Sequence, residues 1–246
     1  VFNASLNQIT INNNNTINNL TLKTARLGDL VIKQIYYAGS HISQGAGLRD
    51  QFIEIFNNSN EVIYADGLYI GQTMGKSNNT ANSNTLSSGQ WDWSRSLGMT
   101  MGNSANTDYV YADYVFQIPG NGTQYPIQPG ESIVIAQSAQ NHKAPLVDTT
   151  GEPITIQNPD LTVDLSNADF EAYLGNFRVS IGEEPYKYDL ENPAVPNILI
   201  GYWGREGFWN GNKDLILDSL GRDSYIIFRG ESLNFVDYPT PDVTEI

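Results

Sequence analysis

The sequence predicts an all-β protein, an antiparallel β-sandwich with long loop insertions and one short helix. Apolar and polar residues alternate over short runs such as Gln51–Phe56, in which Ile53 and Ile55 share one face. The 22 glycines and 11 prolines, together with many asparagines, interrupt these runs at turns. Short strands joined by many turns are typical of a sandwich rather than of a helical bundle.

The chain divides into an N-terminal arm, residues 1–28, and one β-sandwich domain, residues 29–246. The arm contains the run Asn12–Asn15, whose side chains compete with the backbone for hydrogen bonds and favour turns. Two interpretations of the arm remain open: a flexible leader that feeds one strand, or the tail of a truncated upstream domain. Because the sequence begins at Val1 rather than Met, we expect a leader, a lipid anchor or a preceding domain upstream.

The first strands of the domain are expected at Leu30–Tyr37, Gln51–Phe56 and Val62–Ile70. The polar segment Asn57–Asn60 separates the last two and supplies turn residues, so the pattern predicts a hairpin there. Two insertions follow, at about 72–108 and 140–160, where loop residues outnumber any periodic pattern.

Later strands and one helix complete the expected set. The helix is predicted over Ser166–Leu174, with Ser166 as N-cap, Asp169 in the first turn and Gly175 as the stop. The strands are expected at 109–117, 132–137, 161–165, 177–181, 198–203, 215–217 and 225–228.

Composition excludes several classes of function. The 27 acidic and 13 basic side chains give a net charge of −14, and no basic stripe reverses it locally, so we expect no nucleic-acid partner. The absence of cysteine rules out disulfides, cysteine nucleophiles and thiolate metal sites. No apolar run approaches the roughly 20 residues of a membrane span, so no transmembrane segment is expected in this chain.

Three segments together resemble the lamin tail domain, an immunoglobulin-like β-sandwich. They are the strand and Asn turn at Gln51–Asn58, the acidic-Gly turn at Tyr64–Ile70, and Phe116–Gly120 followed by the aliphatic strand at Ile127–Ile135. The order and spacing of the three carry the resemblance, because each motif alone is common. The resemblance implies an immunoglobulin-like sandwich.

A closer match is to an uncharacterised family of Bacteroides-type surface lipoproteins, a domain of unknown function. The segments Ile35–Ser40 and Val163–Asp169 are similar to that family, and the resemblance spans about residues 29–230. It implies an extracytoplasmic address at the cell surface or outer membrane, as a lipoprotein. The family supplies no catalytic residues to carry over.

Candidate catalytic groups are few. The sequence has no Gly-x-Ser-x-Gly elbow for a histidine base, and we expect both histidines, His41 and His142, to be exposed loop residues. A pair of carboxylates for glycoside hydrolysis depends on a spatial separation that sequence does not give. Glu54 lies in mid-strand, where a structural role is commoner. We therefore expect no enzymatic activity, with a hydrolase of an extracellular polymer as the alternative.

One aromatic cluster is a candidate ligand site. Aromatic faces beside amides and a guanidinium suit the stacking and hydrogen bonding that sugars require. The alternative is that these rings pack the sandwich edge beneath a loop. The candidate residues are Tyr202, Trp203, Arg205, Phe208 and Trp209, which Trp91 and Trp93 could join.

A calcium site is a further hypothesis, at Asp160, Asp164 and Asp169, because carboxylate oxygens are the ligands that hard cations prefer. Their spacing is not that of an EF-hand loop, and aspartates serve equally well in turns and caps. No other cofactor is expected.

The sequence therefore predicts a non-catalytic cell-surface module for binding, adhesion or structure, with a glycan or another surface protein as partner. The alternatives are a carbohydrate-binding protein that uses the aromatic cluster and the hydrolase named above.

Overall fold

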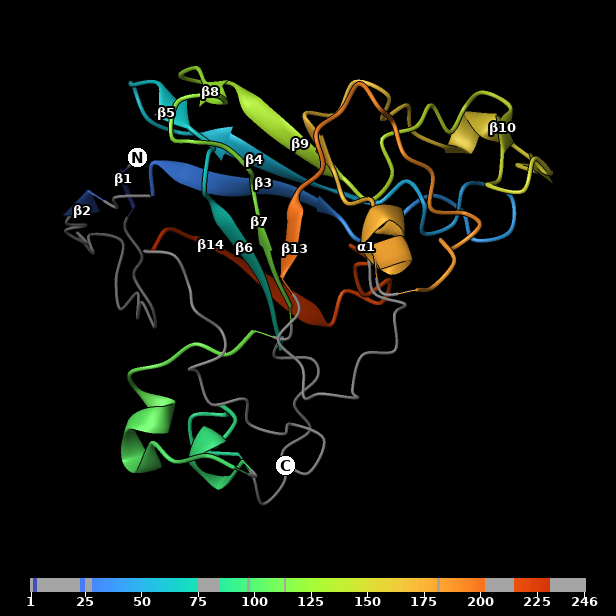
Figure 1. Cartoon of the computed structure of the whole chain (residues 1–246). Coiled ribbons are helices and arrows are strands. Elements are labelled where there is room, and N and C mark those ends of the chain that lie inside the picture. The colour runs from blue at the N-terminus through green and yellow to red at the C-terminus, as the bar shows by residue number, and fades with distance from the viewer. Residues whose placement is uncertain are drawn as a thin grey trace, which may run out of the picture.

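Two four-stranded β-sheets face each other and form a sandwich (Figure 1). This architecture is that of a computed structural model of the chain. It describes residues 2–3, 23–24, 28–74, 85–96, 98–112, 114–180, 182–201 and 215–230. The prediction of an all-β sandwich is confirmed.

The first sheet has the strand order β12-β9-β4-β3. Its strands are β3 (Leu30–Tyr36), β4 (Phe52–Asn57), β9 (Ser132–Ala136) and β12 (Phe170–Glu171). The pairs β3–β4 and β4–β9 are antiparallel, whereas β12 runs parallel to β9. Strand β3 is therefore an outer strand of this sheet.

The second sheet has the order β13-β7-β6-β14, and all its pairs are antiparallel. Its strands are β6 (Tyr69–Met74), β7 (Tyr114–Gln117), β13 (Leu199–Gly201) and β14 (Asp223–Phe228). Strand β14 is an outer strand, and it contacts β3 of the opposite sheet.

Shorter elements surround the sandwich. Three antiparallel pairs join β1 (Phe2–Asn3) to β2 (Lys23–Thr24), β5 (Ile63–Tyr64) to β8 (Pro126–Ile127), and β10 (Leu146–Val147) to β11 (Pro153–Ile154). The helical elements of the described residues are α1 (Gly175–Ser180) and the 3-10 turns η2 (Trp93–Arg95), η3 (Gly102–Asn106) and η4 (Pro159–Leu161).

The core lies between the two sheets. Ile53, Ile55 and Ile135 enter it from the first sheet, and Ile70 and Phe116 from the second, each at most 1% exposed. Burial of one such side chain stabilises the fold by about 1.5–3 kcal/mol. The inward-facing isoleucines confirm the alternation predicted for Gln51–Phe56.

The predicted hairpin between Gln51–Phe56 and Val62–Ile70 is wrong. Strand β4 pairs with β3 and β9, whereas β6 belongs to the opposite sheet. The chain changes sheets at Asp66 and at Gly67, whose φ of 69° lies in the left-handed region. The polar segment Asn57–Asn60 does end a strand, but the chain then crosses to the other sheet. A turn between two strands has the same local sequence pattern whether the strands pair with each other or belong to different sheets.

The predicted helix over Ser166–Leu174 is also misplaced. Phe170 of β12 is fully buried in the core, and its pairing with β9 outweighs the local helical pattern. The helix begins at Gly175, the residue expected to stop it, and the strand predicted at 177–181 is largely this helix. The strands expected at 161–165 and 215–217 do not form.

Candidate functional site

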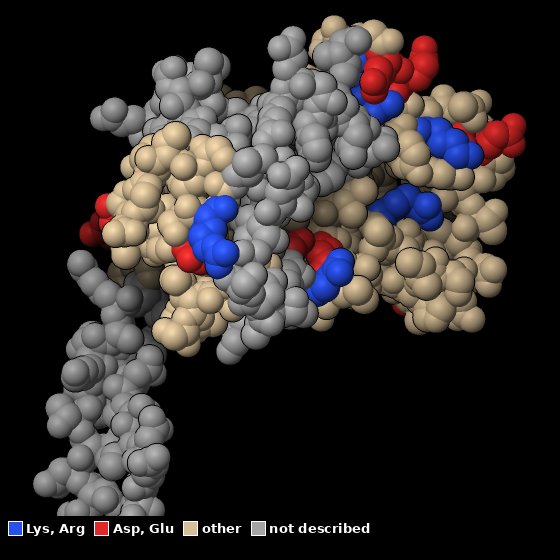
Figure 2. All heavy atoms as spheres, turned by 90° about the horizontal axis from the view of Figure 1, so that it is seen from below, with Lys and Arg blue, Asp and Glu red and all other residues tan. Residues whose placement is uncertain are grey.

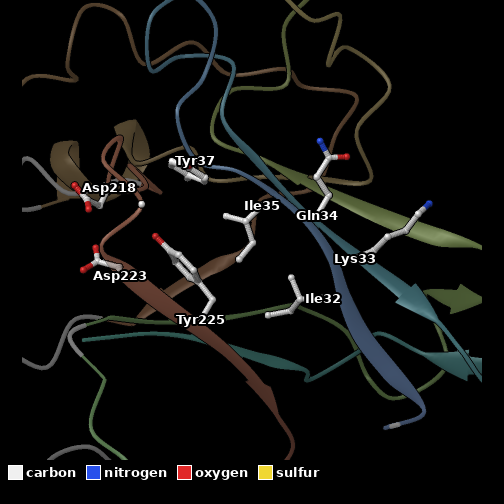
Figure 3. A pocket seen from close by; sticks show the side chains of 9 residues that line it. Ile32, Lys33, Gln34, Ile35, Tyr37, Asp218, Asp223 and Tyr225 are labelled. Carbon is white, nitrogen blue, oxygen red and sulfur yellow. The ribbon is translucent and has the colours of Figure 1, made fainter. Parts of the chain in front are cut away.

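A groove opens at the edge of the sandwich where β3 and β14 lie opposite each other (Figure 3). Its volume is about 350 Å³, within the range typical of sites for small molecules. One wall is β3, and the other is the segment 218–225, which leads into and includes the start of β14.

A β-bulge shapes the β3 wall. Ile32 pairs with Ile55 and Gln34 pairs with Glu54, so Lys33 is an extra residue in the strand. In a regular strand Ile32 and Ile35 would lie on opposite faces, but the extra residue places both on the inner face. Figure 3 shows both isoleucines directed into the groove, with Lys33 directed away from it.

The outward residues of this wall are engaged on the other face of the sheet. Lys33 Nζ lies 2.7 Å from Glu54 Oε1, and this ion pair is partly exposed. Burial alone would raise the pKa of Glu54, but the hydrogen bond and charge of Lys33 bring it below the ordinary value. Glu54 is thus a cross-strand partner, as expected from its position in mid-strand.

The opposite wall begins with a turn held by one ion pair. Arg222 donates from Nη2 to Asp218 Oδ1 and from Nε to Asp218 Oδ2, both at 2.9 Å. Its backbone N–H donates to the same Oδ2 at 2.6 Å. These hydrogen bonds from Arg222 lower the pKa of Asp218 to about 2. These hydrogen bonds fix the turn, and they occupy both carboxylate oxygens of Asp218.

Gly221, in this turn, contacts the ring of Tyr37, the residue that directly follows β3. A Cβ added to Gly221 would lie 2.8 Å from Tyr37 Cε2, and its φ of 67° is in the left-handed region. The ring therefore packs against bare backbone, while 42% of Tyr37 stays exposed.

Gln51 ties the two walls together. It is fully buried at the start of β4, and its Nε2 donates to the carbonyl oxygens of Tyr37 and Leu217. Its Oε1 accepts from the N–H of Leu217 at 3.0 Å. Leu217 directly precedes Asp218, so a single amide fixes the end of β3 relative to the turn. The groove is formed before any ligand arrives.

Asp223 and Tyr225 supply polar groups to the groove. Asp223 Oδ2 accepts from Gln72 Nε2 at 2.8 Å. The hydroxyl of Tyr225 is shielded from solvent, makes no hydrogen bond of ordinary geometry with the described residues, and has the backbone of Asp218 as a polar neighbour. Burial is the main cause that raises the pKa of Tyr225, so it stays a phenol. These groups can bind and orient a ligand.

Sequence reasoning missed this groove. Nothing in the sequence around Tyr37 marks it as part of a groove, and a β-bulge such as that at Lys33 does not show in a pattern of apolar residues. The segment Asp218–Arg222 could have been found, because an acid four residues before an arginine with Gly between them is a turn signal.

Trp91 and Trp93 lie in a folded loop rather than in this groove. Trp93 stacks on Tyr111 with ring centroids 4.2 Å apart, and its backbone N–H donates to Asn106 Oδ1 at 2.7 Å. Trp91 is half-buried and forms an isolated bridge with Thr85. The insertion predicted at 72–108 thus includes ordered structure in its described part.

The remaining aromatic candidates, Tyr202, Trp203, Arg205, Phe208 and Trp209, lie outside the described residues. Whether they form a sugar platform or pack the sandwich stays a prediction.

The three candidate calcium ligands serve separate local structures. Asp164 Oδ1 accepts from the N–H and Oγ of Ser166, at 3.0 and 2.7 Å, and Asp169 Oδ2 accepts from the N–H of Val134 at 2.7 Å. Asp160 is exposed in the 3-10 turn η4. Among the described residues, no group of three or more His, Cys, Asp or Glu side chains is arranged to hold a metal ion. The calcium hypothesis gains no support from this geometry.

The histidines are engaged within the fold. His41 Nδ1 accepts from the backbone N–H of Ser43 and Gln44, at 3.3 and 3.2 Å. The exposed position expected for His142 is wrong: it is 1% exposed, because its ring is buried with Nε2 lying 3.2 Å from Ser138 O. Burial lowers the pKa of His142 and keeps the ring neutral.

Two buried carboxylates also escaped sequence reasoning. Glu171 accepts from the N–H groups of Ala139 and Asn192, at 3.0 and 2.7 Å, and Asp189 accepts from that of Leu174 at 3.0 Å. Burial raises the pKa of Glu171 to about 7 and that of Asp189 to about 6. Both accept hydrogen bonds from backbone N–H groups, and they join distant segments.

Charge on the described surface is mixed. On the face shown in Figure 2, most basic side chains lie beside acidic ones, and no continuous basic patch is visible. None of the described helices has the length and apolar character needed to cross a membrane.

Comparison with known proteins adds a family likeness. Residues 128–239 match the family described as "Protein of unknown function (DUF4876)". The matched region holds the 218–225 wall of the groove but not β3. No curated protein matches this chain in sequence.

A solved structure is similar as well. It is the crystal structure of a DUF4876 family protein from Bacteroides thetaiotaomicron VPI-5482, with a TM-score of 0.56 and 26% sequence identity. The likeness covers 86% of this chain and 45% of that chain, so this chain spans less than half of its length. The expected resemblance to an uncharacterised Bacteroides family is supported by both findings.

Proposed function

We propose that this chain is a non-catalytic binding module of a bacterial cell surface, and that its ligand site is the groove between β3 and β14. The observation that carries the proposal is the clamp at Gln51, whose amide bonds the backbone of both Tyr37 and Leu217 and so fixes Tyr37 beside the Asp218 turn at one end of the groove. Preformed sites with an apolar base and a few fixed polar groups are typical of ligand recognition.

The placement of the titratable groups supports a binding role rather than catalysis. A general acid or base must reach the reacting atoms of a substrate. Glu171, Asp189 and His142 are buried and bound to backbone groups, and Asp218 is saturated by Arg222. The described residues that line the groove offer hydroxyl, carboxylate and aromatic groups, and among them no nucleophile lies beside a base.

The surface address rests on resemblance. The surface-lipoprotein motifs noted in the sequence favour an outer-membrane or cell-surface protein with a lipid anchor, and the Bacteroides source of the similar structure is compatible with that address. The lamin-tail-like motifs favour an immunoglobulin-like subtype of the sandwich. A glycan or another surface protein remains the expected partner.

A thermal-shift screen tests the assignment of the site. A ligand that binds the native state raises its stability, by about 2.7 kcal/mol at a hundredfold excess over the dissociation constant. We expect hits from a panel of soluble glycans and small polar molecules to lose their shift in Tyr37→Ala. Tyr109→Ala is the matched control, because Tyr109 is 44% exposed, close to the 42% of Tyr37, and lies outside the groove. Hits that persist equally in both variants would place the site elsewhere.

A further inference from the structure

We propose that the groove binds the ring of a neutral saccharide, with Tyr37 as its stacking surface and Asp223 and Tyr225 as its hydrogen-bonding groups. This inference rests on the function proposed above and gives its ligand a chemical class.

The aromatic surface is the first step. Tyr37 is backed by the Gly221 backbone and remains 42% exposed. Such support orders the ring without covering it fully. A sugar ring presents an apolar face of C–H groups, which an exposed tyrosine ring matches at low cost in conformational entropy. Ile32 and Ile35 extend the apolar surface inward from Tyr37.

The polar groups match hydroxyls. A sugar hydroxyl both donates and accepts, so it needs an acceptor and a donor close together. The carboxylate of Asp223 accepts, and the phenol of Tyr225 donates. Both line the groove in the same strand, β14, two residues apart and therefore on one face. The Tyr225 hydroxyl has no hydrogen-bond partner of ordinary geometry among the described residues, so a ligand that reaches it after a small turn of the ring supplies the missing bond.

Charge selects against acidic ligands. Lys33 is directed away from the groove and paired with Glu54, and the guanidinium of Arg222 is paired with Asp218. An anionic ligand would therefore meet the carboxylate of Asp223 without an uncommitted cation beside it. The net charge of −14 opposes anions further. A neutral sugar ring is repelled neither by Asp223 nor by the net negative charge of the protein.

Isothermal titration with defined probes tests the inference. Neutral probes are glucose, galactose, mannose, cellobiose, maltose and lactose; glucuronate is the anionic probe and choline the cationic one. We expect at least one neutral sugar to bind at millimolar concentrations, more tightly than glucuronate and choline. Tyr37→Ala should weaken it about tenfold, equivalent to about 1.4 kcal/mol.

Two further variants separate the contribution of the Tyr37 ring from that of the Tyr225 hydroxyl. Tyr37→Phe should retain most of the affinity, and it also keeps the test valid where Tyr37→Ala perturbs folding. Tyr225→Phe should weaken binding several-fold while leaving the ring in place, and Tyr109→Ala should change nothing.

Each contrary result has a distinct meaning. Binding of glucuronate or choline alone, lost in Tyr37→Ala, would overturn the saccharide inference and leave the proposed site standing. A neutral sugar whose affinity is unaffected by Tyr37→Ala and Tyr225→Phe would overturn the inference, because the sugar would bind elsewhere. Failure of every neutral probe would also overturn it, and failure of every probe would count against the proposed function too.

Discussion

The carboxylate of Asp66 occupies the space that a side chain on Gly120 would need. A Cβ added to Gly120 would lie 2.2 Å from Asp66 Oδ1. The oxygens of Asp66 accept four backbone hydrogen bonds, from Asn121, Gly122, Gln124 and Tyr125, at 2.8–3.1 Å. Asp66 belongs to the motif Tyr64–Ile70 and Gly120 to the motif Phe116–Gly120, so two of the three segments that resemble the lamin tail domain are in contact here. The carboxylate requires a glycine at 120, and the turn after Gly120 requires the carboxylate.

Gly120→Ala is expected to lower the free energy of unfolding by about 2–4 kcal/mol, because the new methyl group displaces Asp66 and adds backbone strain. The φ of Gly120 is 128° and that of Gly122 is 105°, but nothing lies within 4 Å of a Cβ on Gly122. Urea denaturation of Gly122→Ala therefore measures strain alone, with an expected loss of about 1 kcal/mol. Equal losses in the two variants would contradict a role for the carboxylate contact.

Asp66→Asn should also destabilise the domain, by about 2 kcal/mol or more. The substitution places an NH₂ donor against a backbone N–H that now donates to a carboxylate oxygen. An unchanged urea midpoint would show that the carboxylate is not what holds the 121–125 turn.

The buried carboxylates predict an unusual dependence of stability on pH. The pKa of Glu171 is about 7 in the folded state against 4.5 when unperturbed, and that of Asp189 is about 6 against 3.8. Between these values the folded state binds more protons than the unfolded chain, so the free energy of unfolding falls as pH rises from about 4 to 7. His142 acts oppositely below pH 6.5, because its pKa is lowered on folding.

Comparing wild type with Glu171→Gln isolates one carboxylate, since His142 contributes equally to both. In Glu171→Gln the free energy of unfolding should fall less as the pH rises towards 7. The difference from wild type amounts to a few kcal/mol between about pH 4 and 7. Chemical denaturation at a series of pH values measures it. Parallel pH profiles for the two proteins would argue against a proton held by Glu171.

Gln51→Leu should cost about 2–4 kcal/mol, because it leaves buried backbone groups of Tyr37 and Leu217 without their partner. Gln128→Leu is the control, because Gln128 is exposed and lies outside the groove, and it should be within about 0.5 kcal/mol of wild type. Faster amide hydrogen exchange at 217–222 in Gln51→Leu alone would show the clamp loosened. Exchange that stays slow there would contradict its role in forming the groove.

The fold class and the inward isoleucines of β4 could be predicted, because alternation in a half-buried strand is a local property. The partner of a strand depends on contacts between segments far apart in the sequence. The sequence therefore predicts a hairpin of β4 and β6, although the two strands lie in opposite sheets. Phe170 shows the same limit: its segment satisfies a helix pattern, but burial against β9 decides for a strand. The groove escaped because it depends on a bulge at Lys33 and on contacts between Gln51 and Leu217, which are far apart in sequence.

The central claim is that the groove between β3 and β14 is the ligand site. The most direct measurement is a titration of the ¹⁵N-labelled protein with the same neutral sugars, followed through its amide resonances. We predict saturable shifts at Ile35–Tyr37 and at 218–225, which need about tenfold more sugar in Tyr37→Ala and an unchanged amount in Tyr109→Ala. Shifts confined to other segments, or none with any sugar that binds, would contradict the claim.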